Sequence, residues 1–296
     1  MELRVLKYFL MVAREENITR AAELLHVTQP TLSRQLAQLE DELGVKLFDR
    51  GQHGIALTED GLLLRRRAVE IVALADKTER ELSHADDLLS GEIAIGSGET
   101  KSIQALIGMM AAFRQQHPDV TFDVYTAAAD EIKEHLDRGL VDVGIVVEPV
   151  EISQYHFLRL PGKERAGVLL RSDSPLAEKA VIRAEDLTGT PLLMVKRPYF
   201  QNELTNWFGA AYEQMAIVAT YNLIYNAAMM VQHHMGVALC LELESHFEGL
   251  CFRPLEPAQE NGTVLIWKKE QILPATTRAF IEHAKKCLER IFSDNQ

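Results

Sequence analysis

The sequence is poor in cysteine and lacks any long hydrophobic run. Its three cysteines, Cys240, Cys251 and Cys287, are too few and too scattered for a disulfide framework, and none forms a CxxC pair of the kind that binds zinc. No stretch of roughly 18 apolar residues is present, and the first residues lack the basic-then-apolar pattern of a secretory signal. We therefore expect a soluble, cytoplasmic protein with no membrane partner.

Common catalytic motifs are missing as well. No GxSxG, HExxH, Walker or GxGxxG pattern occurs, and Ser97 has no recognisable base. His233 and His234 lack a further ligand at metal-binding spacing. We therefore predict no enzyme, no metal site and no cofactor. A transport receptor is an alternative that the missing secretory signal disfavours. A thiol sensor is another, but Cys240 falls in a predicted buried strand, where thiols are usually inert.

Positive charge is in short supply. The chain has 31 Lys and Arg against 43 Asp and Glu, a net charge of -12, which is unusual for a protein that binds nucleic acid. The excess is not uniform, because residues 1–67 hold ten basic and ten acidic side chains and are neutral. This segment can bind DNA if its cations gather on one face and if two copies act together.

The first 58 residues predict three helices followed by a hairpin. Apolar side chains recur at helical spacing in residues 3–13, and Asn17 or Thr19 can cap a short second helix. Thr28 is a good N-cap for a third helix, which has Pro30 in its first turn. A polar, glycine-flanked loop at 49–54 then predicts the tip of a hairpin.

The third helix has an apolar stripe and an opposite polar face. The stripe consists of Leu32, Leu36, Leu39 and Leu43, spaced four, three and four residues apart. Small polar side chains and Arg34 point away from it, as is typical of a recognition helix that enters the major groove of DNA. The alternative is an ordinary solvated helix face.

The sequence resembles the signature of LysR-type transcriptional regulators across residues 21–61. The matching runs are AAELLHVTQPTLSRQ at 21–35, LE at 39–40, LGVKLFDR at 43–50 and LTEDG at 57–61. Together with the polar face, this resemblance implies a winged helix-turn-helix whose DNA-binding residues are Thr28, Gln29, Pro30, Thr31, Ser33, Arg34, Gln38, Arg50, Gln52 and His53. Family members often carry Arg or Lys at the wing tip, so Gln52 and His53 imply weaker anchoring in the minor groove.

Residues 59–90 predict one long helix with an apolar side and no interrupting proline or glycine from 62 to 89. Such a rod is too long to be buried within a small domain. The resemblance implies an antiparallel dimer seam along it, and a core helix within the monomer is the alternative.

Strands alternate with helices from residue 91 onward, which predicts a parallel-rich α/β architecture. We expect winged helix-turn-helix at 1–58, linker helix at 59–90 and effector-binding domain at 91–296. The last has two Rossmann-like subdomains of the periplasmic-binding-protein type. Subdomain I spans about 91–161 and 267–296, and subdomain II about 162–266.

A ligand between these subdomains is expected at the carboxyl ends of their strands. The turn at 97–100 precedes a helix whose first N–H groups are free, so it can hold a carboxylate, with countercharge from Lys196 and Arg197. Glu99 would oppose an anion, and each of these residues can instead be a helix cap or a surface residue. The candidate effector-binding residues are Ser97, Gly98, Glu99, Thr100, Thr126, Glu148, Lys196, Arg197, Tyr221 and Asn222.

The resemblance implies a sequence-specific DNA-binding regulator controlled by a small-molecule effector. We expect a homodimer, and a homotetramer built from it, on a partly palindromic promoter site, with RNA polymerase as a further partner.

Overall fold

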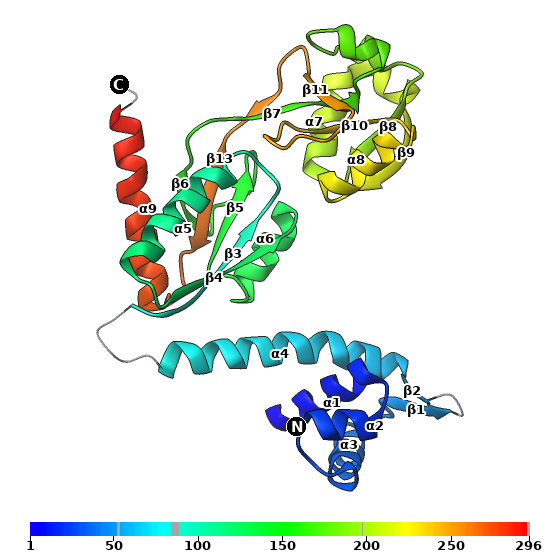
Figure 1. Cartoon of the computed structure of the whole chain (residues 1–296), viewed down its shortest axis with the longest axis vertical. Coiled ribbons are helices and arrows are strands. Elements are labelled where there is room, and N and C mark those ends of the chain that lie inside the picture. Colours follow the sequence, from blue (N-terminus) through cyan, green and yellow to red (C-terminus); the bar gives the residue numbers. More distant parts are fainter. Residues whose placement is uncertain (52–53, 84–88, 197, 295–296) are drawn as a thin grey trace. The chain divides into compact units, whose positions relative to one another are not determined.

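The computed structural model describes residues 1–51, 54–83, 89–196 and 198–294. The chain divides into two compact units, Met1–Ala85 and Asp86–Gln296 (Figure 1). The first unit is a helix-turn-helix with a hairpin and a long helix, and the second contains two sheets covered by helices. This architecture confirms the predicted fold class.

Three short helices form the core of the first unit. They are α1 (Leu3–Glu15), α2 (Ile18–Leu24) and α3 (Gln29–Leu43). Phe9 and Leu36 are buried where these helices meet, because the apolar positions of each recur at helical spacing. The helix α3 ends at Gly44, whose φ of 71° is the left-handed conformation that glycine adopts most readily. The hairpin of β1 (Phe48–Gly51) and β2 (Gly54–Leu57) follows, and then the long helix α4 (Glu59–Ser83).

The first subdomain of the second unit is a sheet with strand order β4-β3-β5-β13-β6. In β3, Ile93 and Ile95 pack toward α5 and α9, whereas Ala94 packs toward α6, so helices cover both faces. The elements are β3 (Gly91–Ser97), α5 (Ile103–Gln116), β4 (Val120–Thr126), α6 (Ala129–Asp137), β5 (Val143–Val147), β6 (Tyr155–Arg159), β13 (Thr263–Lys268) and α9 (Ala275–Asp294).

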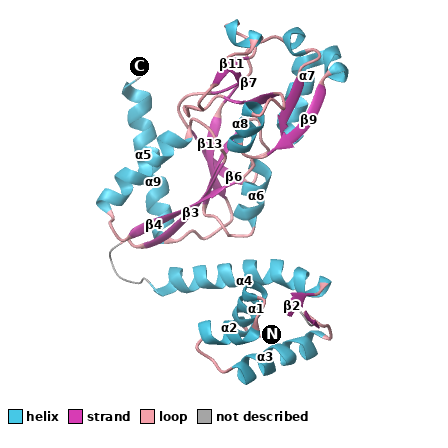
Figure 2. Cartoon of the chain, turned by 45° about the vertical axis from the view of Figure 1, so that its right-hand side comes forward, coloured by secondary structure: helices cyan, strands magenta, loops and turns pink. Residues whose placement is uncertain are grey.

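The second subdomain has the strand order β11-β7-β10-β8-β9, with β12 also paired to β7. Figure 2 distinguishes both sheets by colour from the helices around them. Short 3-10 turns lie at Pro175–Glu178, Ala184–Leu187 and Gly209–Gln214. The elements are β7 (Glu164–Arg171), β8 (Pro191–Val195), α7 (Pro198–Phe208), β9 (Ala216–Tyr221), α8 (Ile224–Gln232), β10 (Val237–Leu241), β11 (Leu250–Pro254) and β12 (Glu260–Asn261).

One predicted subdomain boundary is wrong. We predicted that subdomain II extends to about residue 266, but β13 begins at Thr263 and pairs with β5 and β6 of subdomain I. The chain therefore returns to subdomain I before β13, and the whole strand belongs to the sheet of that subdomain. The strands β6, β11 and β12 each follow another strand without an intervening helix, which departs from the predicted alternation of strands and helices.

Candidate nucleic-acid interface and effector pocket

The helix α3 has one buried face and one outward face. Leu32, Leu36 and Leu39 are at most 2% exposed, which fixes the rotation of the helix against α1 and α2. Arg34 is exposed on the opposite side and is the one basic residue of α3. Of the predicted DNA-binding residues in this region, the exposed ones are Thr28, Gln29, Pro30, Arg34 and Gln38, and the half-buried ones are Thr31 and Ser33.

Two polar side chains on this face already have partners. Thr28 occupies the predicted N-cap position, but its Oγ1 pairs with Thr31 Oγ1 at 2.8 Å instead of accepting from a backbone amide. Gln38 Nε2 donates to Glu42 Oε1 at a long 3.4 Å. Both contacts are exposed, so water or DNA can replace them at little cost.

The predicted wing residues are only partly placed. Arg50 lies in β1, with its Cα opposite Ile55 of β2. Gln52 and His53 lie outside the described residues. The sequence expectation of a weakly anchored wing therefore stays a prediction.

Glu40 joins the recognition helix to the wing and was not predicted as a functional residue. Its carboxylate accepts from Lys46 Nζ at 2.9 Å, from the Leu47 amide at 2.8 Å and from the Phe48 amide at 3.3 Å. Burial opposes ionisation, but these three donors outweigh it and hold the pKa of Glu40 below its usual value. The carboxylate thus fixes the start of β1 against α3.

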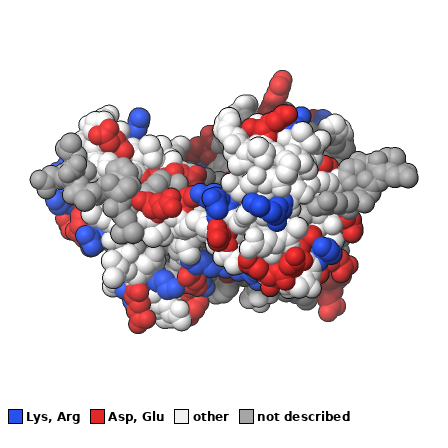
Figure 3. Space-filling model, turned by 90° about the horizontal axis from the view of Figure 1, so that it is seen from below, with Lys and Arg blue, Asp and Glu red and all other residues white. Residues whose placement is uncertain are grey.

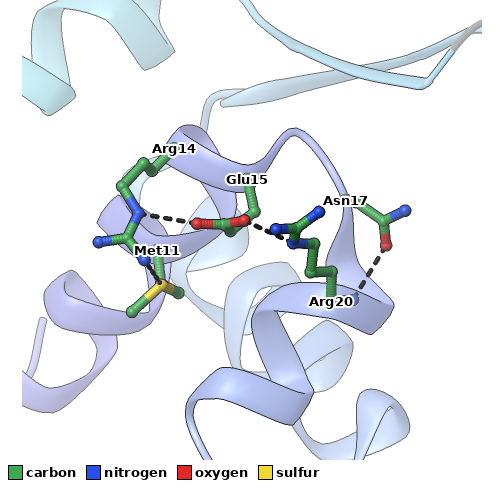
Figure 4. Close-up of polar contacts among 5 residues, drawn as sticks. All are labelled: Met11, Arg14, Glu15, Asn17 and Arg20. Carbon is green, nitrogen blue, oxygen red and sulfur yellow. Dashed lines mark hydrogen bonds and ion pairs between the residues drawn. The ribbon is translucent and has the colours of Figure 1, made fainter.

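Charges around the α1–α2 turn are neutralised locally. Glu15 accepts from Arg14 Nε at 2.8 Å and from Arg20 Nε at 2.9 Å, while Asn17 Oδ1 accepts from the Arg20 amide at 3.0 Å (Figure 4). Asn17 is thus the cap of α2, one of the two predicted alternatives. The face drawn in Figure 3 also carries basic and acidic side chains interspersed with one another.

A cavity of about 110 Å³ lies between the two subdomains of the second unit. The turn after β3, the segment after β4 and the ends of β5, β8, β9 and β10 supply its walls, as expected for the carboxyl ends of parallel strands. Seven of the predicted effector residues line it: Gly98, Glu99, Thr100, Thr126, Lys196, Tyr221 and Asn222.

Two of the predicted effector residues that the structure describes are not among the lining. Ser97 is buried, and its Oγ donates to the Gly98 carbonyl at 2.9 Å. The carboxylate of Glu148 lies against Gly262 and accepts from Arg159 Nη2 at 3.3 Å. The structure thus corrects both assignments. Arg197 lies outside the described residues.

Most of the remaining wall is apolar and was not predicted. Polar residues at strand ends can be recognised in a sequence as candidate binding residues. Alanine and valine at such positions cannot be distinguished from core residues. The additional lining residues are Ala127, Ala128, Ala129, Ile132, Ile145, Val146, Val147, Val195, Leu223, Ile224, Cys240, Leu241 and Leu243.

The helix start expected to bind an anion is occupied by the protein itself. Glu164, which is fully buried, accepts from the amides of Lys101 at 3.0 Å and Ser102 at 2.9 Å, immediately before α5. It also accepts from Ser102 Oγ at 2.6 Å and from Thr263 Oγ1 at 3.2 Å. The N–H groups predicted to be free are therefore used, because the carboxylate of a distant strand satisfies them.

Tyr221 and Cys240 are buried parts of the pocket wall. The Tyr221 hydroxyl donates to the Leu239 carbonyl at 2.6 Å, and burial raises the pKa of Tyr221 well above its ordinary value. Burial likewise raises the pKa of the Cys240 thiol to about 12. A thiol with this pKa is almost entirely protonated at neutral pH, which disfavours the alternative of a thiol sensor at this position.

Comparison with known proteins finds relatives along nearly the whole chain. The family model described as LysR substrate binding domain matches residues 86–288, and that of the bacterial regulatory helix-turn-helix proteins of the lysR family matches residues 3–62. The Hca operon transcriptional activator HcaR of Escherichia coli (strain K12) is 30% identical over 285 residues, or 93% of this chain and 94% of that protein.

Solved structures share the fold. The crystal structure of CbnR, a LysR family transcriptional regulator, matches with a TM-score of 0.77 at 23% identity, covering 97% of this chain and 99% of that one. Full-length CbnR complexed with its target DNA gives a TM-score of 0.75 at 23% identity, covering 97% and 100%. Among the described residues, no helix is both long and apolar enough to cross a membrane. The chain belongs to the LysR family of DNA-binding transcriptional regulators, with a helix-turn-helix followed by a substrate-binding domain.

Proposed function

We propose that the outward face of α3 reads base edges in the major groove of a promoter, with Arg34 as its principal contact. The proposal depends on the position of Arg34, which is exposed on the face opposite the buried leucines. Arg34 is also the one cation of this helix. A guanidinium can donate two hydrogen bonds to a guanine, whereas the small polar neighbours can contact phosphates or other bases. The wing contributes through Arg50, Gln52 and His53.

We propose a homodimer formed through α4, and a homotetramer formed from two such dimers. The helix carries large apolar side chains that the rest of the first unit leaves exposed. Leu62, Leu63, Val69, Ile71 and Leu74 are between 40% and 54% exposed. A second copy of the helix can bury them, and two-fold symmetry would match a partly palindromic site.

We further propose that a small-molecule effector binds in the cavity between the subdomains and changes their relative position. The family consists of transcriptional regulators, so we propose this binding as the sole chemistry of the second unit, without catalysis or a cofactor. Its action takes place in the cytoplasm, at a promoter where RNA polymerase is the further partner.

Arg34→Ala tests the DNA-reading proposal. Fluorescence anisotropy of the full-length protein with its own promoter region and with random DNA, at physiological salt, measures the specific affinity. Loss of a base contact costs about 1–3 kcal/mol, so we expect Arg34→Ala to weaken promoter binding by roughly 5- to 150-fold. The matched control is Arg114→Ala, which removes the same charge from the exposed face of α5. Unchanged promoter affinity for Arg34→Ala would remove this residue from the interface.

A further inference from the structure

The 46–48 segment, which leads from the end of α3 into β1, is hydrogen-bonded from two sides. On one side the buried carboxylate of Glu40, in α3, accepts from the Leu47 amide at 2.8 Å. On the other side lies Thr58, the residue before α4. It donates from its amide to the Leu47 carbonyl at 3.1 Å and from Oγ1 to the Lys46 carbonyl at 2.6 Å. The recognition helix and the long helix are therefore linked through a short stretch of backbone.

The start of α4 lies beside the hairpin (Figure 1) and fits against the 46–48 segment without room for a side chain. Thr58 Oγ1 also accepts from the Gly61 amide at 2.9 Å, so one hydroxyl joins the Lys46 carbonyl to the first turn of α4. A Cβ atom at Gly61 would lie 2.1 Å from the Leu47 carbonyl oxygen. Alanine is normally the better helix former, so this close approach is the reason that α4 needs glycine here.

The contacts between α4 and α1 are of a different kind. Ala68 of α4 is fully buried in the same apolar cluster as Phe9 of α1, and Lys7 Nζ pairs with Asp76 Oδ1 at 2.6 Å. Apolar packing is non-directional, and an ion pair between partly exposed side chains can adjust to a small movement. These contacts hold α4 on the first unit, whereas the directional backbone contacts at the 46–48 segment fix its orientation relative to α3.

We propose that Glu40 and Thr58, by holding the 46–48 segment, set the spacing between the two DNA half-sites that a dimer recognises. This inference rests on the dimer through α4 proposed above. In that dimer α4 forms the contact between subunits and α3 the contact with DNA. The geometry at the junction of these helices therefore determines the separation and the angle of the two recognition helices, and such dimers read half-sites at a defined separation.

The length of α4 amplifies a small change at this junction. A helix of 25 residues is about 37 Å long at a rise of ~1.5 Å per residue. A rotation of about 10° at its start displaces its far end by roughly 6 Å, close to two base-pair steps of ~3.4 Å. Loosening the junction should therefore admit neighbouring half-site spacings, while the outward face of α3 still recognises the same half-site sequence.

Selection of bound duplexes from a random-sequence DNA library by the full-length protein, followed by sequencing, measures both the half-site sequence and the spacing. We expect the wild type to select paired half-sites with one predominant spacing. Thr58→Val removes the hydroxyl that joins Lys46 to Gly61 and should spread the selected sites over two or more spacings with the same half-site sequence. Thr58→Ser keeps the hydroxyl and should restore the single spacing.

The outcomes that contradict the proposal are distinguishable from one another. Wild-type sites without paired half-sites would overturn the dimer and, with it, this inference. The same single spacing for the wild type and Thr58→Val would overturn the role of the junction and leave the dimer intact. Loss of the half-site sequence in Thr58→Val would show that this residue serves the folding of the helix-turn-helix rather than the spacing.

Gly61→Ala provides a second, independent variant. Its Cβ would displace the start of α4 from the Leu47 carbonyl, so we expect the predominant spacing to shift by at least one base pair. The matched control is Gly108→Ala, which places a Cβ in open space on α5 and should leave the spacing unchanged. An unchanged spacing in Gly61→Ala would overturn the proposal, even if Thr58→Val could not be purified in folded form.

Discussion

In both units a carboxylate accepts hydrogen bonds from backbone amides, but the separation along the chain between acceptor and donor is very different. In the first unit Glu40 accepts from the amides of Leu47 and Phe48, seven and eight residues away. In the second unit Glu164 accepts from Ser102 at a separation of 62, and Glu99 from Ile224 at a separation of 125. The junction between α3 and the hairpin is therefore assembled locally, whereas the pocket exists only once distant segments have met.

Removing Glu164, the fully buried anchor, should have the largest effect. Glu164→Ala leaves two amides and two hydroxyls without their acceptor in a buried position, so we expect the free energy of unfolding of the second unit to fall by about 3 kcal/mol or more. Both tryptophans, Trp207 and Trp267, lie in this unit, so their fluorescence during urea unfolding of the full chain follows it selectively.

The exposed Glu178→Ala is the control for this measurement. It should leave the tryptophan transition within about 0.5 kcal/mol of the wild type. A similarly small change for Glu164→Ala would show that the stability of the second unit does not depend on this carboxylate. The distant contacts would then contribute no more to the free energy of unfolding than the local ones.

The local anchor should matter less and should depend on pH. At pH 7 we expect Glu40→Gln to cost the first unit about 1–2 kcal/mol, because the ion pair with Lys46 and one amide contact are lost. Since folding lowers the pKa of Glu40 from its ordinary 4.5, its stabilisation is present above that value and is lost as the pH falls through the folded pKa. The wild type and variant should therefore converge in acid.

Hydrogen exchange of the Leu47 and Phe48 amides provides the measurement for Glu40→Gln, with the exposed Glu23→Gln as control. Faster exchange at neutral pH with an unchanged tryptophan transition would support the prediction that Glu40 stabilises the first unit alone. Slowed or equal exchange would contradict it.

The smallest effect belongs to the most local contact. Asn17→Ala removes the cap of α2 and should destabilise the first unit by about 1 kcal/mol. Circular dichroism during thermal unfolding measures the loss, and Asn17→Asp, which can still accept from the Arg20 amide, should restore most of it. A cost above that of Glu164→Ala would reverse the proposed ranking.

The first unit was predictable because its signals are short-range. The four leucines of α3 recur with a helical period, Gly44 marks the end of the helix, and Asn17 is a polar cap before an apolar segment. The outward position of Arg34 follows from the same period. Glu40 was missed as an anchor because its donors lie beyond the helix end, where the period carries no information.

The pocket was predictable only in outline. Polar residues after strands, such as Thr100 and Asn222, indicated the correct edge of each sheet. Glu148 obeyed the same rule but points to Gly262, which depends on how the crossing segments pack. Glu164 gave no signal at all, because a single acidic residue at a strand start is usually exposed.

The place of β13 in the sheet has a consequence for synthesis on the ribosome. This strand lies between β5 and β6, yet it is made about a hundred residues after them. During translation, the helix-turn-helix and then the inserted second subdomain can fold while the first sheet still has a gap at that position. A nascent chain stalled before residue 263 should therefore expose the unpaired edges of β5 and β6 to chaperones.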